Sequence, residues 1–144
     1  MSKTQQRAEI TGLRIVSLVV DDVDDAIEFY TQTLGFEVKA DDDFEMDGQA
    51  GRWVTVGVPG QDVEISLVEA EEPYYDENTQ TLLESKRGTE TWWTFRTPDC
   101  EASVAALRDA GVEITQEPRT YPWGTEAMFA DPSGNQFSLF EYAE

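Results

Sequence analysis

The sequence predicts an α+β fold made of two copies of one βαβββ module, and three observations support this prediction. The stretch Leu13–Val38 has the pattern of a strand, a helix opened by acidic residues, a glycine that ends the helix, and a second strand. Thr91–Ile114 repeats this plan with one residue deleted near the glycine. After each copy, apolar and polar residues alternate as in a β-hairpin.

At 144 residues, the chain is expected to form a single domain over residues 1–144. Module one is assigned to about 13–69, an acidic connector to about 70–90, and module two to about 91–142. No apolar run approaches the roughly 18 residues that a membrane helix needs, and the N-terminus MSKTQQRAEI lacks a signal-peptide hydrophobic region. We therefore expect a cytoplasmic protein with no membrane partner.

The first module begins with a strand predicted at 14–20, which places Val16, Leu18 and Val20 on one face. Asp22 is the expected N-cap of the following helix, because an aspartate there accepts a hydrogen bond from a free backbone amide. Gly35 is expected to end that helix. The buried stripe of the helix is predicted to consist of Val23, Ala26, Ile27, Tyr30 and Leu34.

The segment KADDDFEMDGQAG at 39–51 is predicted to be a solvated acidic loop. Its Asp43-x-Glu45-x-Asp47-Gly48 spacing partly matches a calcium-binding loop. However, the position that needs a bidentate glutamate is Val54, so calcium is the weaker alternative. Two hairpin strands are predicted next, at 52–58 and 63–68.

In the connector, Thr81–Ser85 is expected to form a short helical turn. Module two follows the order of module one, with Asp99 as N-cap and Gly111 as the helix stop. Cys100, the only cysteine, excludes an internal disulfide, and it is expected to be a small core residue. The strands of module two are predicted at 92–97, 112–115, 126–130 and 136–141, with a turn at 131–135 between the last two.

The charge balance limits the partners of the protein. The chain has 30 acidic and 10 basic residues, a formal net charge of −20. Nucleic-acid binding is excluded because phosphate contacts need a basic patch. Strong self-repulsion is relieved when salt screens the charges, which suggests a halophile protein that loses structure when desalted. The alternative is an acidic protein from an ordinary cell.

The longer motifs resemble those of the vicinal oxygen chelate superfamily, which contains glyoxalases, bleomycin-resistance proteins and extradiol dioxygenases. The resemblance covers about 13–141 and rests on AIEFYTQTLGFEV in module one and DPSGNQF before the last strand. It implies that the two modules form a half-open mixed-sheet barrel with the helices outside and a ligand cavity inside. It also implies a homodimer.

Strand alternation assigns residues to the two faces of these sheets. One set is apolar and suited to packing under the helices: Val16, Leu18, Val20, Ile65, Leu67, Trp93, Phe95, Phe137 and Leu139. The opposite set mixes apolar and polar side chains, as a ligand cavity does, although a face exposed to water is the alternative. From this second face we predict a ligand-binding site formed by Ile15, Ser17, Ser66, Trp92, Thr94, Arg96, Ser138 and Phe140.

In the metal-dependent members of the vicinal oxygen chelate superfamily, which this sequence resembles, histidine and glutamate ligands lie on the first and last strands of each module. Counted from Asp22 and Asp99 and from the DPSGNQFS motif, these positions are occupied here by Ile15, Trp92, Ser66 and Ser138. The chain contains no histidine. Glu64 would reach a ligand position only if the hairpin register slipped by two residues, and Glu141 is expected to point away from the cavity. We therefore predict no metal and no cofactor.

No combination of residues in the sequence predicts a catalytic residue, since there is no Ser-His-Asp set and no base beside Cys100. The sequence favours a metal-free binder of an unknown small molecule. Trp92 would offer a stacking surface, the hydroxyl groups would orient polar atoms, and Arg96 would bind a carboxylate or phosphate. One alternative is an enzyme of glyoxalase or dioxygenase type, a lyase or oxidoreductase with an atypical or absent metal site. The other is a dimeric scaffold that binds no ligand.

Overall fold

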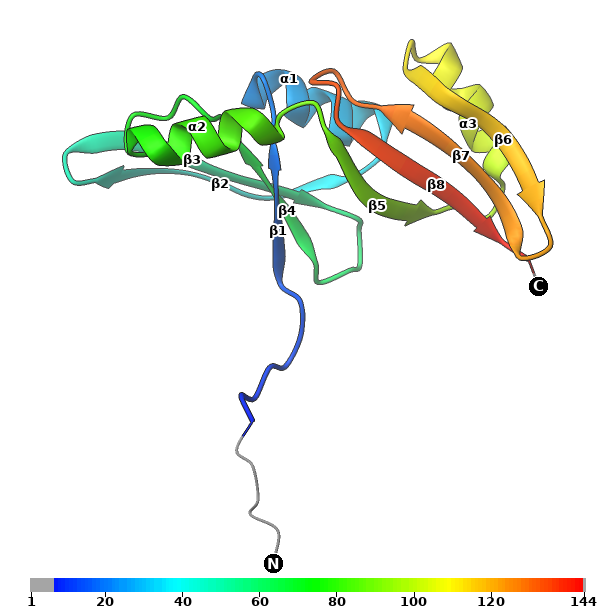
Figure 1. The fold of residues 1–144 in the computed structure, drawn as a ribbon, viewed down its shortest axis with the longest axis horizontal. Coiled ribbons are helices and arrows are strands. Elements are labelled where there is room, and N and C mark those ends of the chain that lie inside the picture. Colours follow the sequence, from blue (N-terminus) through cyan, green and yellow to red (C-terminus); the bar gives the residue numbers. More distant parts are fainter. Residues whose placement is uncertain (1–6, 144) are drawn as a thin grey trace, which may run out of the picture.

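The computed structural model describes residues 7–143, the side chain of Glu90 excepted. It contains two four-stranded mixed sheets, one from each module (Figure 1). In the view of Figure 1 the helices α1, α2 and α3 lie along the upper side and the sheets lie beneath them. The expected fold class, two βαβββ modules with helices outside the sheets, is confirmed.

Module one forms the first sheet in the order β1-β4-β3-β2, with β1 and β4 parallel and the other pairs antiparallel. Its helix continues into a π-helical turn, η1, before Gly35 adopts a positive φ of 76° and ends it. The elements are β1 Ile15–Val19, α1 Val23–Glu28, η1 Phe29–Thr33, β2 Glu37–Met46, β3 Gln49–Gly57 and β4 Glu64–Val68.

Module two repeats this topology with the order β5-β8-β7-β6, and β5 is parallel to β8. The elements are β5 Glu90–Arg96, α3 Cys100–Asp109, β6 Glu113–Tyr121, β7 Gly124–Ala130 and β8 Gln136–Tyr142. Gly111 follows α3 with φ 84°, as expected of a helix stop.

The hydrogen bonds at the helix starts repeat as closely as the topology does. The Asp22 carboxylate accepts from the Asp25 amide, and the Asp99 carboxylate accepts from the Ala102 amide, so both expected N-caps are confirmed. A glutamate from the last strand region of each module adds a second bond. Glu69 accepts from the Val23 amide, and Glu141 from the Cys100 amide, both at 2.8 Å.

The prediction of a solvated loop at 39–51 is wrong. This segment forms most of a long hairpin between β2 and β3 that turns at Asp47-Gly48. Both turn residues have positive φ, 51° and 77°, the geometry of the two-residue hairpin turns that favour Asp-Gly. The Asp-Gly pair was the signal for this turn, but the density of acids around it obscured the alternation.

Two other elements are longer than expected. The connector contains α2, Glu77–Lys86, where only a turn at Thr81–Ser85 was predicted. Its N-cap is Asp76, which accepts from the Thr79 amide at 2.7 Å. Strand β6 runs to Tyr121 rather than to residue 115, because irregularities after Ile114 and Gln116 let this edge strand accommodate Pro118.

The core lies between the sheets and the helices and is continuous across both modules. The predicted apolar set is confirmed: Leu18, Val20, Ile65, Leu67, Phe137 and Leu139 are buried, and Val16, Trp93 and Phe95 pack against them. Cys100 is fully buried, and burial raises the pKa of its thiol above the usual range, so it is a core residue.

A buried polar cluster joins the two modules at the 131–135 turn. The Tyr30 hydroxyl donates to the Asp131 carboxylate at 2.8 Å, across 101 positions in the sequence. The Asn135 amide donates to the Val19 carbonyl at 2.8 Å, and its oxygen accepts from the Gly88 amide at 3.0 Å. Burial and the Asp131 charge both raise the pKa of Tyr30 far above its usual range, so this hydroxyl stays a donor.

Within residues 7–143, no helix is both long enough and apolar enough to cross a lipid bilayer.

Candidate functional site

The second face of module two contains a small pocket of about 210 Å³. Three residues predicted for the ligand site line it together, namely Trp92, Thr94 and Ser138. They come from the neighbouring strands β5 and β8, and Thr94 pairs directly with Ser138. Glu126 and Met128, from β7, complete the lining.

Trp92 has an unusual backbone conformation. Its φ is +61°, and the register between β5 and β8 is interrupted at this point, between Glu90 and Thr94. A positive φ costs a bulky residue about 1–2 kcal/mol, so the surrounding structure must impose it. The result is an indole that is 85% exposed and stands at the edge of the pocket. Bulges of this kind often re-aim a side chain next to a binding site.

The polar floor of the pocket is a hydroxyl–carboxylate pair. Ser138, which is 6% exposed, donates to one carboxylate oxygen of Glu126 at 2.6 Å. The direct cross-strand partner of Glu126 is a cation, Arg119. Its guanidinium instead lies over the ring of Tyr121, 5.3 Å from the centroid.

Module one has a related arrangement that is closed by its own side chains. Ser66 donates to Ser17 at 2.9 Å, so these two predicted residues contact each other. Beside them Thr55 donates to Glu64 at 2.6 Å, and the other oxygen of Glu64 pairs with Arg14 at 2.9 Å.

The module-one residues of the predicted site are thus separate from the Trp92 pocket. Ile15 is 37% exposed on β1, and it pairs with Glu64 in the register that aligns Ser17 with Ser66. Module two aligns Thr94 with Ser138 in the same way, so the two-residue slip considered for Glu64 does not occur. The structure does not bring Ile15, Ser17 and Ser66 into one pocket with Trp92.

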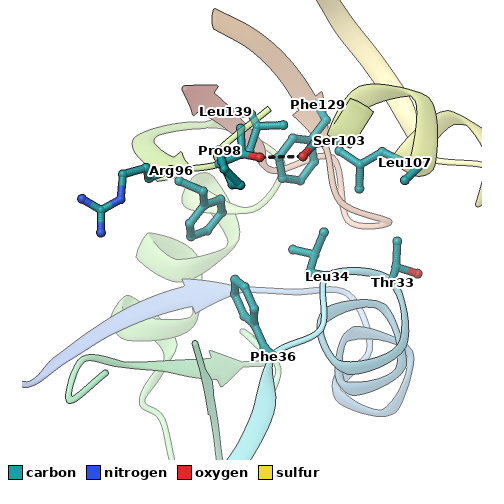
Figure 2. Close-up of a pocket in the computed structure, with 12 residues that line it drawn as sticks. Thr33, Leu34, Phe36, Arg96, Pro98, Ser103, Leu107, Phe129 and Leu139 are labelled. Atoms are coloured by element: carbon teal, nitrogen blue, oxygen red, sulfur yellow. Dashed lines mark hydrogen bonds between the residues drawn. The ribbon is translucent and has the colours of Figure 1, made fainter. Parts of the chain in front are cut away.

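Arg96 and Phe140 also lie outside the Trp92 pocket. Arg96 borders a second pocket, of about 280 Å³, at the junction of the two modules (Figure 2). Figure 2 shows its guanidinium extending away from Leu34, Phe36, Leu107, Phe129 and the other side chains around this pocket. Phe140 packs against Tyr142, with ring centroids 4.6 Å apart.

Metal-dependent enzymes of the vicinal oxygen chelate superfamily hold their ion at four positions. The residues of this chain at those positions are poor metal ligands. Ile15 and Trp92 supply no donor, and Ser66 and Ser138 supply only hydroxyl groups already engaged with Ser17 and Glu126. No group of three or more suitable Asp, Glu or Cys side chains occurs within the described part of the chain. These residues do not fit a divalent metal, and they support no metal-dependent step.

Sequence reasoning missed Glu126 and Met128 as lining residues. Both occupy alternate positions of a predicted strand, and the position of Met128 opposite Ser138 depends on strand pairing. A signal was nevertheless present. Counting back two residues from Met128 along the same face gives Glu126, an acid in a strand that otherwise consists of small and apolar residues.

The family of the chain follows from its sequence and its fold. Residues 12–139 match the model of the Glyoxalase/Bleomycin resistance protein/Dioxygenase superfamily, and the protein belongs to this family.

Among solved structures, the chain is 37% identical to UcmS2, with a TM-score of 0.76 over 92% of this chain and 99% of that one. It is 29% identical to TnmS3, an antibiotic binding protein from Streptomyces sp. CB03234, with a TM-score of 0.74 over 95% of this chain and 100% of that one. It is also 31% identical to YurT, an uncharacterized protein of Bacillus subtilis (strain 168), over 88% of this chain and 96% of that protein.

Proposed function

We propose that this protein binds a small molecule in the Trp92 pocket without a metal ion, and that it acts by holding the ligand rather than by transforming it. The observation that carries the proposal is the strained, exposed Trp92 beside a polar floor formed by Ser138 and Glu126. Strained backbone conformations of this kind cluster at binding and active sites. The similarity to an antibiotic binding protein supports the same interpretation.

The pocket of one chain covers only part of such a ligand. Its volume of about 210 Å³ is below the roughly 300–1,000 Å³ of ordinary ligand pockets. Trp92 also remains 85% exposed. We therefore propose that a second copy of this chain covers the open side, forming a homodimer. Sedimentation velocity in 2 M KCl should give a dimer mass, and a monomer at micromolar concentration would contradict this proposal.

The binding proposal is tested with three flat tricyclic probes of different charge: proflavine, acridone and acridone-4-carboxylate. Fluorescence titration should detect binding of at least one probe by the wild type. Trp92→Ala should weaken that binding about tenfold or more, because base-sized stacking contacts contribute about 1–3 kcal/mol.

Trp123→Ala is the matched control. Trp123 is also exposed, but it stacks on Tyr121 at a centroid distance of 5.1 Å and does not line the pocket. Its removal should leave the affinity unchanged. If Trp123→Ala and Trp92→Ala weaken binding equally, the proposed site is wrong. If none of the three probes binds, the result favours a scaffold without a ligand.

Metal content separates binding from the enzymatic alternative. Protein purified in 2 M KCl should contain substoichiometric amounts of manganese, iron, nickel and zinc by mass spectrometry. A stoichiometric transition metal would favour a glyoxalase- or dioxygenase-type enzyme.

We also propose that the protein works in a cytoplasm loaded with salt, as halophile proteins do. The formal net charge of −20 supports this. At molar salt the screening length falls to about 3 Å, which removes most repulsion between exposed carboxylates.

A further inference from the structure

We propose that Glu126 makes the Trp92 pocket selective for ligands that carry a positive charge beside a flat aromatic body. This inference rests on the proposed binding function and adds the chemical class of the ligand. It follows from a contrast between two carboxylates, Glu64 and Glu126, that occupy the second faces of the two modules.

Glu64 is neutralised inside its own module. Its side chain is 13% exposed, and its two oxygens are used by Thr55 and by the guanidinium of Arg14. A carboxylate placed in such a site is stabilised by a cation because burial disfavours the charged form. Module one therefore needs no external positive charge.

Glu126 has only a neutral partner within residues 7–143. Ser138 donates to one oxygen, Oε2, and the other oxygen has no protein donor among the described residues. No Lys or Arg of the described residues forms an ion pair with it. A half-buried carboxylate with one hydrogen bond leaves several acceptor sites open.

Arg119 is the residue best placed to neutralise Glu126, because the two are cross-strand partners. Its guanidinium lies over Tyr121 instead. A cation stacked on a tyrosine is held there by the ring and by contact area. Arg119 therefore leaves the pocket side of Glu126 accessible to a ligand.

The other lining residues define the rest of the ligand. Trp92 presents a flat, electron-rich face, which favours both aromatic rings and cations. Met128 adds a polarisable thioether that packs well against aromatic rings. A protonated amine or amidine attached to a planar ring would place its charge at Glu126 and its ring against Trp92.

The three tricyclic probes test this inference, with titrations in 2 M KCl so that the general field of the acidic chain is screened. Wild-type protein should bind the cation proflavine about tenfold or more tighter than acridone-4-carboxylate, since hydrogen bonds between oppositely charged groups are stronger than those between neutral groups. Glu126→Gln keeps the shape of the side chain and its bond to Ser138. It should reduce the proflavine affinity about tenfold and leave that of acridone within about twofold.

Glu113→Gln is the matched control, because it removes the same charge from an exposed position on β6 outside the pocket. It should leave all three affinities within about twofold of the wild type. Equal losses in the two variants would overturn the inference, since only the overall charge would then attract the cation. Equal binding of proflavine and the carboxylate would overturn it too, while the binding function stands. Failure of all three probes to bind would contradict both.

Discussion

The two modules share a backbone plan but differ in what they leave open. Both start their helices with an aspartate cap and a glutamate from a distant segment. On the second face, however, module one pairs its polar groups among themselves, whereas module two leaves the half-buried Glu126 without a cation among the described residues and leaves Trp92 exposed. A repeated fold can therefore keep its structural hydrogen bonds in both copies while the side chains on the second face differ between them.

The modules also differ in charge. Residues 13–69 contain 14 acidic and 3 basic residues, whereas residues 91–142 contain 8 acidic and 3 basic residues. Much of the excess negative charge of module one lies on the β2–β3 hairpin. There the guanidinium of Arg52 donates a hydrogen bond to the Asp41 carboxylate at 2.8 Å, and this contact lowers the pKa of Asp41. Because self-repulsion grows with charge, module one should depend more on salt than module two does.

Removal of salt is expected to have the largest effect on the stability of the two modules. At low salt, hydrogen exchange should show loss of amide protection first in β2 and β3, with β7 and β8 protected for longer. In 2 M KCl both modules should be protected, and the melting temperature should rise by more than about 10 °C, because the Debye length falls from about 30 Å at 0.01 M to about 3 Å at 1 M. A melting temperature that is flat across this range would contradict the high-salt proposal.

Substitution of Asn135 should have the next largest effect on stability, because the polar cluster around this residue joins the two modules. Asn135→Ala leaves the Val19 carbonyl and the Gly88 amide without their partner, and it should lower the free energy of unfolding by about 3 kcal/mol. Urea unfolding in 2 M KCl measures this. The equivalent position in module one is Val63, which is 36% exposed. Val63→Ala should cost less than about 1 kcal/mol, and similar losses at both positions would contradict the asymmetry.

Trp92 and Ile15 occupy equivalent positions in the two modules. Replacing alanine by glycine should raise the stability at position 92 and lower it at position 15. Trp92→Gly should be more stable than Trp92→Ala by about 1 kcal/mol, because φ +61° suits glycine. Ile15 lies in the regular register of β1, so Ile15→Gly should be less stable than Ile15→Ala by about 0.5–1 kcal/mol. Comparing these two pairs removes the effect of losing the side chain. The same sign at both positions would mean that the strain at Trp92 is absent in solution.

The smallest expected effect on stability is that of removing the charge of Glu72, in the connector between the modules. Burial, followed by the charges of Glu69 and Glu71, raises the pKa of Glu72. The folded state thus prefers the protonated form, and at pH 7 the ionised form destabilises the fold relative to the unfolded chain. Glu72→Gln should raise the melting temperature at pH 7 by about 1–2 °C. The gain should vanish near pH 4, where Glu72 is largely protonated in the wild type. Glu113→Gln should show no such pH dependence.

Strand alternation, helix caps and glycine stops predicted the elements well wherever the signal was local. The aspartate caps, the two glycine stops and the apolar faces of β1, β4, β5 and β8 all follow from the identity of residues a few positions apart. The hairpin at 37–57 was missed because a run of acids outweighed the Asp-Gly turn signal. Helix α2 was underestimated because none of its residues is buried, so its sequence lacks a strong apolar stripe.

The structure brings together only some of the residues predicted for the ligand site, and their role in binding stays a prediction. Three of its eight residues meet in the Trp92 pocket, because they lie on two strands that pair directly. Ser17 and Ser66 bond to each other in the other module, and Arg96 lies at the junction. The alternation of a strand tells which face a residue occupies, but not which sheet will stand opposite that face.

By itself, the sequence determined the repeated module, the family, the charge and the residue types at the four positions that correspond to metal ligands, since each depends only on the order of residues along the chain. Tertiary structure alone decided that Trp92 adopts a positive φ, that Glu126 lies beside Ser138, and that Arg14 neutralises Glu64 but no cation pairs with Glu126 among the described residues. These features depend on a register irregularity and on cross-strand distances. Such quantities arise only when distant segments pack together.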